Sequence, residues 1–277
     1  MDLFVRDSGP AGAPTIVFLH GGRMSGWSWE PVVERMHGYR CLVPDLPQYG
    51  GSFQQGPFEI GRATDAVAEL IRSRARGGRA HVVGFSLGAQ VGVRLLATQP
   101  KLVDRAVLCG TVINTMPGVR LTQLVLGLLA RTKWFRWEIK RHWNAGHGDI
   151  EIPSARIDDY REDMRLMTGA QIAHIVVASV GFTRPEGLDQ SDSPTLFLTG
   201  AKELPFVRRS AVALAQSMPN GVDRVAIGMG HDWPLRYPDL FSRTVDSWLT
   251  DTALPPEIAL AKLGVQAGSR TARPAAR

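Results

Sequence analysis

The stretch HVVGFSLGAQ, residues 81–90, decides the fold of this chain. An apolar run typical of a buried strand ends at Phe85, and an apolar pattern typical of a helix begins at Leu87. Between them, Ser86 is the centre of a G-x-S-x-G pattern at residues 84–88. A sharp strand-to-helix turn exposes such a hydroxyl at the carboxyl edge of a sheet. A chance match in a glycine-rich chain is the alternative, but the strand and helix context favours the turn, so Ser86 is the candidate nucleophile.

Strand and helix patterns alternate along the chain. Short apolar runs predict strands at 15–20, 39–45, 80–85, 105–110, 195–200 and 223–228. Helical spacing of apolar residues predicts helices at 27–37, 60–76, 87–100, 206–218 and 236–250. Continuous apolar runs suit strands that are covered on both faces, as in a parallel sheet. The alternation therefore predicts an α/β fold, with a mostly parallel sheet flanked by helices.

The alternation is interrupted between residues 113 and 187, where the pattern is helical and no strand is evident. We expect this segment to be a helical cap inserted into a core formed by residues 1–112 and 188–250. Residues 251–277 are expected to be a flexible basic tail. The apolar run 119–130 is too short to span a bilayer, and a buried cap helix is expected there rather than a membrane-surface anchor.

The charge of the chain is concentrated at its end. The formal net charge is +6, and Lys262, Arg270, Arg273 and Arg277 account for four of these charges, which leaves +2 for the remainder. Because no aromatic residue interleaves these cations, a solvated tail is expected rather than a nucleic-acid site.

The composition also limits the classes of protein to which this chain can belong. The two cysteines, Cys41 and Cys109, lie in apolar runs and are expected to be buried, without a disulfide framework or a metal site. No secretory signal pattern or membrane span is evident, so we expect a cytoplasmic monomer or homodimer.

A serine nucleophile needs a base and a carboxylate that orients it. His231 follows the last predicted strand in a glycine-flanked loop, and it is the candidate base. The order serine, acid, histidine points to the loop after residues 195–200, where Glu203 is the candidate acid. Asp189 and Asp192 are the alternatives.

The negatively charged oxygen that forms when a serine attacks a carbonyl group needs backbone N–H groups as hydrogen-bond donors. The N–H of Leu87, directly after the nucleophile, is one candidate, and the N–H of Gly22 in the loop His20-Gly21-Gly22-Arg23 is the other. We expect His20 to brace this loop by hydrogen bonds.

Five segments together resemble the α/β-hydrolase fold family, over roughly residues 1–250. They are LHGG (19–22), VPDLPQYGGS (43–52), GFSLG (84–88), TGAKE (199–203) and GHDWPLRYPDLF (230–241). The resemblance implies an eight-stranded, mostly parallel sheet with a helical lid inserted after the sixth strand. In this chain Gln48 and Tyr49 stand where the family often has a glycine and a variable residue, and Glu203 stands where aspartate is commoner. Asp45 is similar to a structural aspartate of that turn.

The chemistry that follows is acyl transfer. The resemblance, with serine as nucleophile, argues against the branches of the family that use aspartate. We expect a hydrolase without cofactor or metal, which cleaves a small or medium apolar carboxylic ester through an acyl-enzyme. A lyase, a perhydrolase or a carbon–carbon bond hydrolase with the same triad is the alternative, and a non-catalytic ligand receptor is a third.

The substrate is expected to be a small molecule, and no nucleic acid. Arg23, Trp134, Trp137 and Trp143 are the candidate substrate-binding residues, although the tryptophans could equally pack the cap onto the core. Lys140 and Arg141 could hold a substrate carboxylate or simply be solvated.

Overall fold

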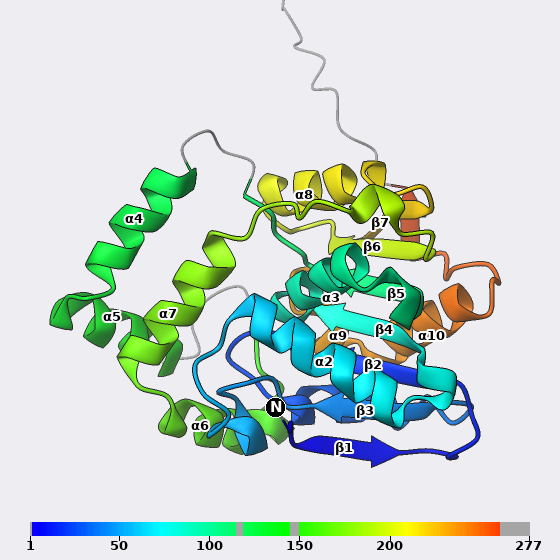
Figure 1. The fold of residues 1–277 in the computed structure, drawn as a ribbon, viewed down its shortest axis with the longest axis horizontal. Helices are drawn as coiled ribbons and strands as arrows, with labels where there is room; N and C mark the ends of the chain where they lie inside the picture. The colour runs from blue at the N-terminus through cyan, green and yellow to red at the C-terminus, as the bar shows by residue number, and fades with distance from the viewer. Residues whose placement is uncertain (1, 115–118, 145–149, 261–277) are drawn as a thin grey trace, which may run out of the picture.

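The computed structural model describes residues 2–114, 119–144 and 150–260 of the chain. Eight strands form one sheet in the order β1-β3-β2-β4-β5-β6-β7-β8 (Figure 1). Strands β2 to β7 run parallel, and β1 and β8 pair antiparallel at the two edges. This confirms the predicted eight-stranded, mostly parallel sheet. The strands are β1 (Val5–Ser8), β2 (Thr15–Leu19), β3 (Arg40–Pro44), β4 (Ala80–Phe85), β5 (Val103–Cys109), β6 (Thr195–Gly200), β7 (Gly221–Ala226) and β8 (Ile258–Leu260).

Helices cover both faces of the sheet. In Figure 1, α2 and α3 lie in front of the strands and α10 lies behind them. Strands β2 and β6 are buried along their whole length, as their continuous apolar runs predict. The helices of this part are α1 (Glu30–Val33), α2 (Ile60–Arg74), α3 (Leu87–Thr98), α8 (Pro205–Gln216), α9 (Trp233–Arg236) and α10 (Pro238–Leu249).

In the described part of the chain, four α-helices lie between β5 and β6 and form a group beside the carboxyl ends of the parallel strands (Figure 1). They are α4 (Val119–Leu129), α5 (Lys133–Asn144), α6 (Ile157–Leu166) and α7 (Gly169–Val180). We call them the inserted helices. They follow the fifth strand along the chain, whereas the resemblance implied the sixth. Helices α4 and α5 both pack against α7.

Two expectations from the sequence are wrong. Residues 258–260, assigned to the tail, form β8 and pair with β7, and the rest of the tail from residue 261 lies outside the described residues. Helix α4 is present, but it is not buried, because five of its apolar side chains are exposed. Within the described ranges, no helix is both long enough and apolar enough to cross a bilayer.

Candidate active site

Ser86 occupies a strained turn between β4 and α3. Its backbone φ is 51° and its ψ is −110°, a combination that non-glycine residues rarely adopt. The Ser86 N–H donates to the Cys109 carbonyl at 2.8 Å, which ties the turn to β5. A Cβ atom at Gly88 would overlap the Leu19 carbonyl, so glycine is required where α3 passes over β2. The turn is the one that the G-x-S-x-G pattern predicts.

Glu203 and His231 meet at the same edge of the sheet. Glu203 Oε2 lies 3.0 Å from His231 Nδ1, and Glu203 Oε1 accepts the Gly200 N–H at 3.0 Å. The Glu203 side chain is only 1% exposed, so its carboxylate is held between these two donors and away from water. An imidazole that donates through Nδ1 keeps Nε2 as its basic nitrogen. The alternative acids, Asp189 and Asp192, are both exposed.

Gly110 makes room for the histidine ring. It follows β5 directly, with a φ of 67°. A Cβ atom there would lie 2.5 Å from His231 Cε1, so any larger residue would displace the ring. The ring also packs against Phe85, with the two centroids 4.9 Å apart. Sequence reasoning did not single out Gly110, although a glycine directly after a buried strand was a visible signal.

His20 braces the loop that carries Gly22. The Leu46 N–H donates to His20 Nε2 at 2.9 Å, so Nδ1 carries the proton and donates to the Gly21 carbonyl at 2.8 Å. Burial lowers the pKa of His20 to about 4. The ring is therefore neutral at neutral pH and fixed in one tautomer. This bracing role is the one expected from the sequence.

Ser86 borders two cavities. The first has a volume of about 180 Å³, and both Gly22 and Leu87 line it beside Ser86. Most of its remaining wall is apolar and comes from the inserted helices and the segment between them: Trp143, Ile150, Ile175, Val176 and Val180. The second, of about 390 Å³, is lined by Ser86 together with Glu203 and His231. The residues predicted for nucleophile, base, acid and oxyanion donors therefore gather around one serine.

The three tryptophans predicted to bind substrate do not lie at the same site. Trp143 is buried and lines the apolar cavity, whereas Trp134 and Trp137 are 67% and 61% exposed and do not line it. At 100° per residue, Trp134 and Trp143 lie on opposite faces of α5. One helix cannot bring both to the same cavity, and the expectation for Trp134 and Trp137 is corrected accordingly.

Arg23 joins the Gly22 loop to the inserted helices. Its φ is 70°, in the left-handed region. Its Nη2 donates to the Tyr160 hydroxyl at 2.8 Å, and its guanidinium lies 5.7 Å from the ring centroids of Trp143 and Tyr160. The Tyr160 hydroxyl in turn donates to the Trp143 carbonyl. Arg23 therefore lines the apolar cavity beside Trp143 of α5, and Tyr160 of α6 holds its guanidinium in place.

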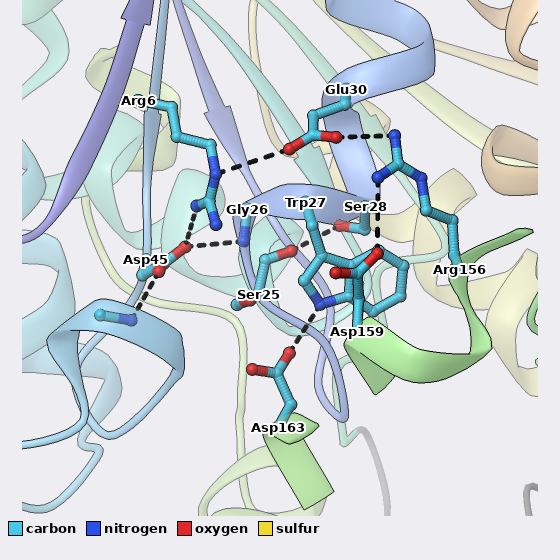
Figure 2. A network of polar contacts seen from close by, with 11 residues as sticks. Arg6, Ser25, Gly26, Trp27, Ser28, Glu30, Asp45, Arg156, Asp159 and Asp163 are labelled. Carbon is cyan, nitrogen blue, oxygen red and sulfur yellow. Dashed lines mark hydrogen bonds and ion pairs between the residues drawn. The ribbon is translucent and has the colours of Figure 1, made fainter. Parts of the chain in front are cut away.

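A second set of polar contacts fixes the segment after this loop (Figure 2). Trp27 Nε1 donates to Asp163 Oδ2 of α6 at 2.7 Å, and Glu30 pairs with Arg156 at 2.6 Å. Burial raises the pKa of Asp163 to about 6, against the opposing effect of the Trp27 hydrogen bond. Sequence reasoning missed Asp163, because it lies 136 positions from its partner and no motif links them.

Asp45 anchors the turn after β3, as expected. It is fully buried and accepts hydrogen bonds from Gly26 N–H at 2.7 Å, Gly51 N–H at 2.8 Å and Arg6 at 2.8 Å. Gln48, where the family often has glycine, has a φ of 71°. Its Oε1 accepts the Phe58 N–H at 2.9 Å, which offsets the strain of a left-handed backbone.

Among the residues that the structure describes, no three His, Cys, Asp or Glu side chains are grouped as a metal ion would require. Both cysteines are buried, as expected.

The sequence of this chain is similar to a known protein family. A model of the alpha/beta hydrolase family matches residues 16–244. An AB hydrolase superfamily protein of Gibberella zeae is 28% identical over 257 residues, which cover 91% of this chain and 86% of that protein. An esterase of Mycobacterium tuberculosis is 36% identical over 98 residues, 35% of this chain and 32% of that protein.

A solved structure agrees at the level of the fold. The enol-lactonase of Burkholderia xenovorans matches with a TM-score of 0.69 and 20% identity, over 90% of this chain and 96% of that one. The family model spans most of the chain and the sheet has the corresponding topology, so this chain belongs to the alpha/beta hydrolase family.

Proposed function

We propose that the chain is a serine hydrolase that cleaves a small or medium apolar carboxylic ester through an acyl-enzyme. The observation that carries the proposal is the pair formed by Glu203 and His231 beside the cavity that Ser86 also lines. A buried carboxylate that orients an imidazole is the arrangement that activates a serine hydroxyl. The esterase relative supports the same reaction class.

In the first half of the reaction, Ser86 Oγ attacks the ester carbonyl carbon and its proton passes to His231 Nε2. The carbonyl oxygen gains the negative charge, and the N–H groups of Gly22 and Leu87 donate to it. When the tetrahedral intermediate collapses, the bond to the alcohol oxygen breaks and His231 returns the proton to that oxygen. Ser86 is left as an acyl ester. Glu203 stabilises the imidazolium that forms in between.

In the second half, His231 takes a proton from water and the resulting hydroxide attacks the acyl carbon. The second tetrahedral intermediate uses the same two backbone donors. Its collapse breaks the bond to Ser86 Oγ, which recovers the proton from His231, and the carboxylic acid leaves. Each proton taken by His231 is returned within the same half-reaction, so the enzyme is restored.

The apolar cavity supports the choice of substrate. Its volume of about 180 Å³ is smaller than the roughly 300–1,000 Å³ of cavities that hold drug-sized ligands, so a small acyl group fits it. Its wall of isoleucine, valine and tryptophan favours an apolar group over a charged one.

The experiment is a series of 4-nitrophenyl esters of increasing acyl length, assayed with the wild-type chain and with Ser86→Ala. We expect turnover of short acyl esters by the wild type, and loss of at least about 10³-fold in the variant. Equal rates for the two proteins would contradict the proposal. Turnover of no ester, with Ser86 still reactive toward an acylating probe, would favour the lyase, perhydrolase or carbon–carbon hydrolase alternatives. Our further expectations, a cytoplasmic location and a monomer or homodimer, remain predictions.

A further inference from the structure

Helix α4 presents an apolar face away from the protein. It packs against α7, and on the side that is not packed five apolar side chains are between 41% and 66% exposed. The last four lie three, four, seven and eight residues after the first, which places all five on one helix face. They are Leu121, Leu124, Val125, Leu128 and Leu129.

Helix α5, which follows α4 in the chain, also carries exposed apolar side chains. Trp134 and Trp137 are more than 60% exposed and lie three residues apart, so they share one side of that helix. Both helices lie at the end of the molecule that is farthest from β7 and β8 (Figure 1). We call the five α4 side chains and these two tryptophans the outer set. Exposed apolar groups in such number mark an interaction surface rather than ordinary solvent-facing residues.

The outer set is embedded in positive charge. Residues 119–144 contain six Lys or Arg and one Glu, a net charge of +5 within a chain whose total is +6. The single carboxylate, Glu138, is paired with Arg141 at 2.7 Å. Beside Trp137, a groove of about 550 Å³ between α5 and the start of α7 is lined by Arg136, Lys140 and Arg141. Apolar and cationic surfaces therefore meet at Trp137.

We propose that the outer set docks on the surface of an anionic lipid layer. Leucines and tryptophans on one side of a helix, with lysines and arginines beside them, are the composition of segments that lie in the membrane interface. The apolar side chains would enter the boundary between headgroups and acyl chains, while the cations in the groove bind lipid phosphates. An anionic leaflet attracts each such cation over about a Debye length.

The same charges argue against a second copy of this chain as the occupant. Two chains meeting through their outer sets would bring together two segments that each carry a net charge of +5, and like charges opposed across an interface disfavour association. A lipid surface supplies the negative charge that this face lacks.

The proposed surface lies close to the candidate active site, because α5 itself lines the cavity at Ser86 through Trp143. Ile175, Val176 and Val180 of α7 line the cavity at Ser86, and α4 and α5 pack against α7. Docking would place the cavity next to a lipid phase. The inference goes beyond the proposed hydrolase activity and does not depend on it, because Ser86→Ala leaves the outer set unchanged.

The test is sedimentation of the full chain with vesicles of phosphatidylcholine alone, or with about 30% phosphatidylglycerol added. We expect at least about 10-fold tighter binding to the anionic vesicles, and weaker binding as salt is raised from about 0.1 M to about 0.5 M. The double variant Leu124→Glu/Leu128→Glu should lose at least about 10-fold in binding, because two leucines no longer enter the lipid. Both side chains are exposed, so the fold is retained, which circular dichroism verifies.

Two controls separate this surface from other parts of the chain. Leu260→Glu changes a leucine that is more exposed than Leu124 and Leu128, at 68%, on the edge strand β8, and it should leave binding within about twofold. The second control is the triple variant Arg270→Gln/Arg273→Gln/Arg277→Gln, which removes three tail charges. It should keep at least a tenth of the wild-type affinity for anionic vesicles.

Three results would overturn the inference. One is the absence of binding to anionic vesicles, and another is binding that survives Leu124→Glu/Leu128→Glu but is lost with the tail charges. The third is self-association of the wild-type chain in lipid-free buffer, seen as a larger sedimentation coefficient and lost in the double variant, without any binding to vesicles. This result would assign the surface to a second copy of the chain. Vesicle binding without ester turnover would contradict the proposed function alone.

Discussion

The carboxylate of Glu203 bridges a backbone and a ring: Oε1 accepts the Gly200 N–H and Oε2 lies 3.0 Å from His231 Nδ1. The first contact fixes the carboxylate at the end of β6, and the second fixes the imidazole after β7. Glutamate reaches the histidine here from a position where aspartate is commoner in the family. The extra methylene is accommodated because the side chain folds back onto Gly200, the last residue of β6.

Replacing the carboxylate tests this arrangement. Glu203→Gln keeps the shape of the side chain but removes the charge that stabilises the imidazolium and the acceptor that selects its tautomer. We expect kcat to fall by about 10³- to 10⁴-fold. The matched control is Asp232→Asn, next to the histidine, whose carboxylate accepts the Glu151 N–H at 3.0 Å instead. Steady-state kinetics on a 4-nitrophenyl ester separate the two, and a larger loss for Asp232→Asn would contradict the assignment of the acid.

Gly110→Ala should disturb the base without removing it. The added Cβ would lie 2.5 Å from His231 Cε1, so the ring must move. A displacement of about 1 Å at a catalytic group can lower kcat by about 10²-fold. The left-handed backbone adds a loss of about 1–2 kcal/mol in the free energy of unfolding. Gly38→Ala, at a position with no atom within 4 Å of the added Cβ, is the control. An unchanged kcat for Gly110→Ala would show that the ring position is unimportant.

The apolar cavity should set the preferred acyl length. Ile175 is buried in its wall, and Ile175→Ala enlarges the space available to the substrate. We expect the ratio of kcat/KM for a longer acyl ester over the acetyl ester to rise by about 10-fold. Ile71→Ala in α2 removes the same atoms away from this cavity. Both variants should lose about 2–4 kcal/mol in the free energy of unfolding, but only the first should change the ratio. A similar change of ratio in both would refute the role of the cavity.

Asp163 should make stability depend on pH. Burial raises its pKa in the folded chain from 3.8 to about 6. Between these values the unfolded chain releases a proton that the folded chain retains, so the contribution of Asp163 to stability falls as pH rises and is constant above about pH 6. Asp163→Asn lacks this titration.

The measurement is urea unfolding of both proteins from about pH 4 to about pH 7. The free energy of unfolding of Asp163→Asn, relative to the wild type, should rise by up to about 3 kcal/mol across this range. Asp158→Asn, at a side chain that is 92% exposed, controls for the removal of a surface carboxyl. A difference that is independent of pH would show that Asp163 is already ionised when buried.

Much of the sheet and the grouping around Ser86 could be predicted from the sequence, for a physical reason. Parallel strands end at one edge of a sheet, so the loops after β4, β6 and β7 must lie together once these strands are recognised. Buried strands are recognised as continuous apolar runs, and the glycines at positions 84 and 88 indicate the sharp turn at Ser86. Strand β8 was missed because three residues on an edge carry almost no periodic signal.

The inserted helices were harder to predict. Helical spacing shows which residues share a face, but it does not show which face another element covers. For this reason the leucines of α4 were expected to be buried, and Trp134 was grouped with Trp143 although the two lie on opposite faces of α5. The contact of Trp27 with Asp163 depends on how α6 packs on the core, which no local pattern encodes.

The most direct test of the central claim is covalent labelling with an aryl fluorophosphonate, followed by mass spectrometry of the peptides. Such a probe reacts with a serine hydroxyl that a neighbouring base has activated. We predict a single adduct on Ser86, formed in parallel with the loss of ester turnover, and no adduct in Ser86→Ala. An adduct on another residue, or equal labelling of the wild type and Ser86→Ala, would contradict the assignment of Ser86 as the nucleophile.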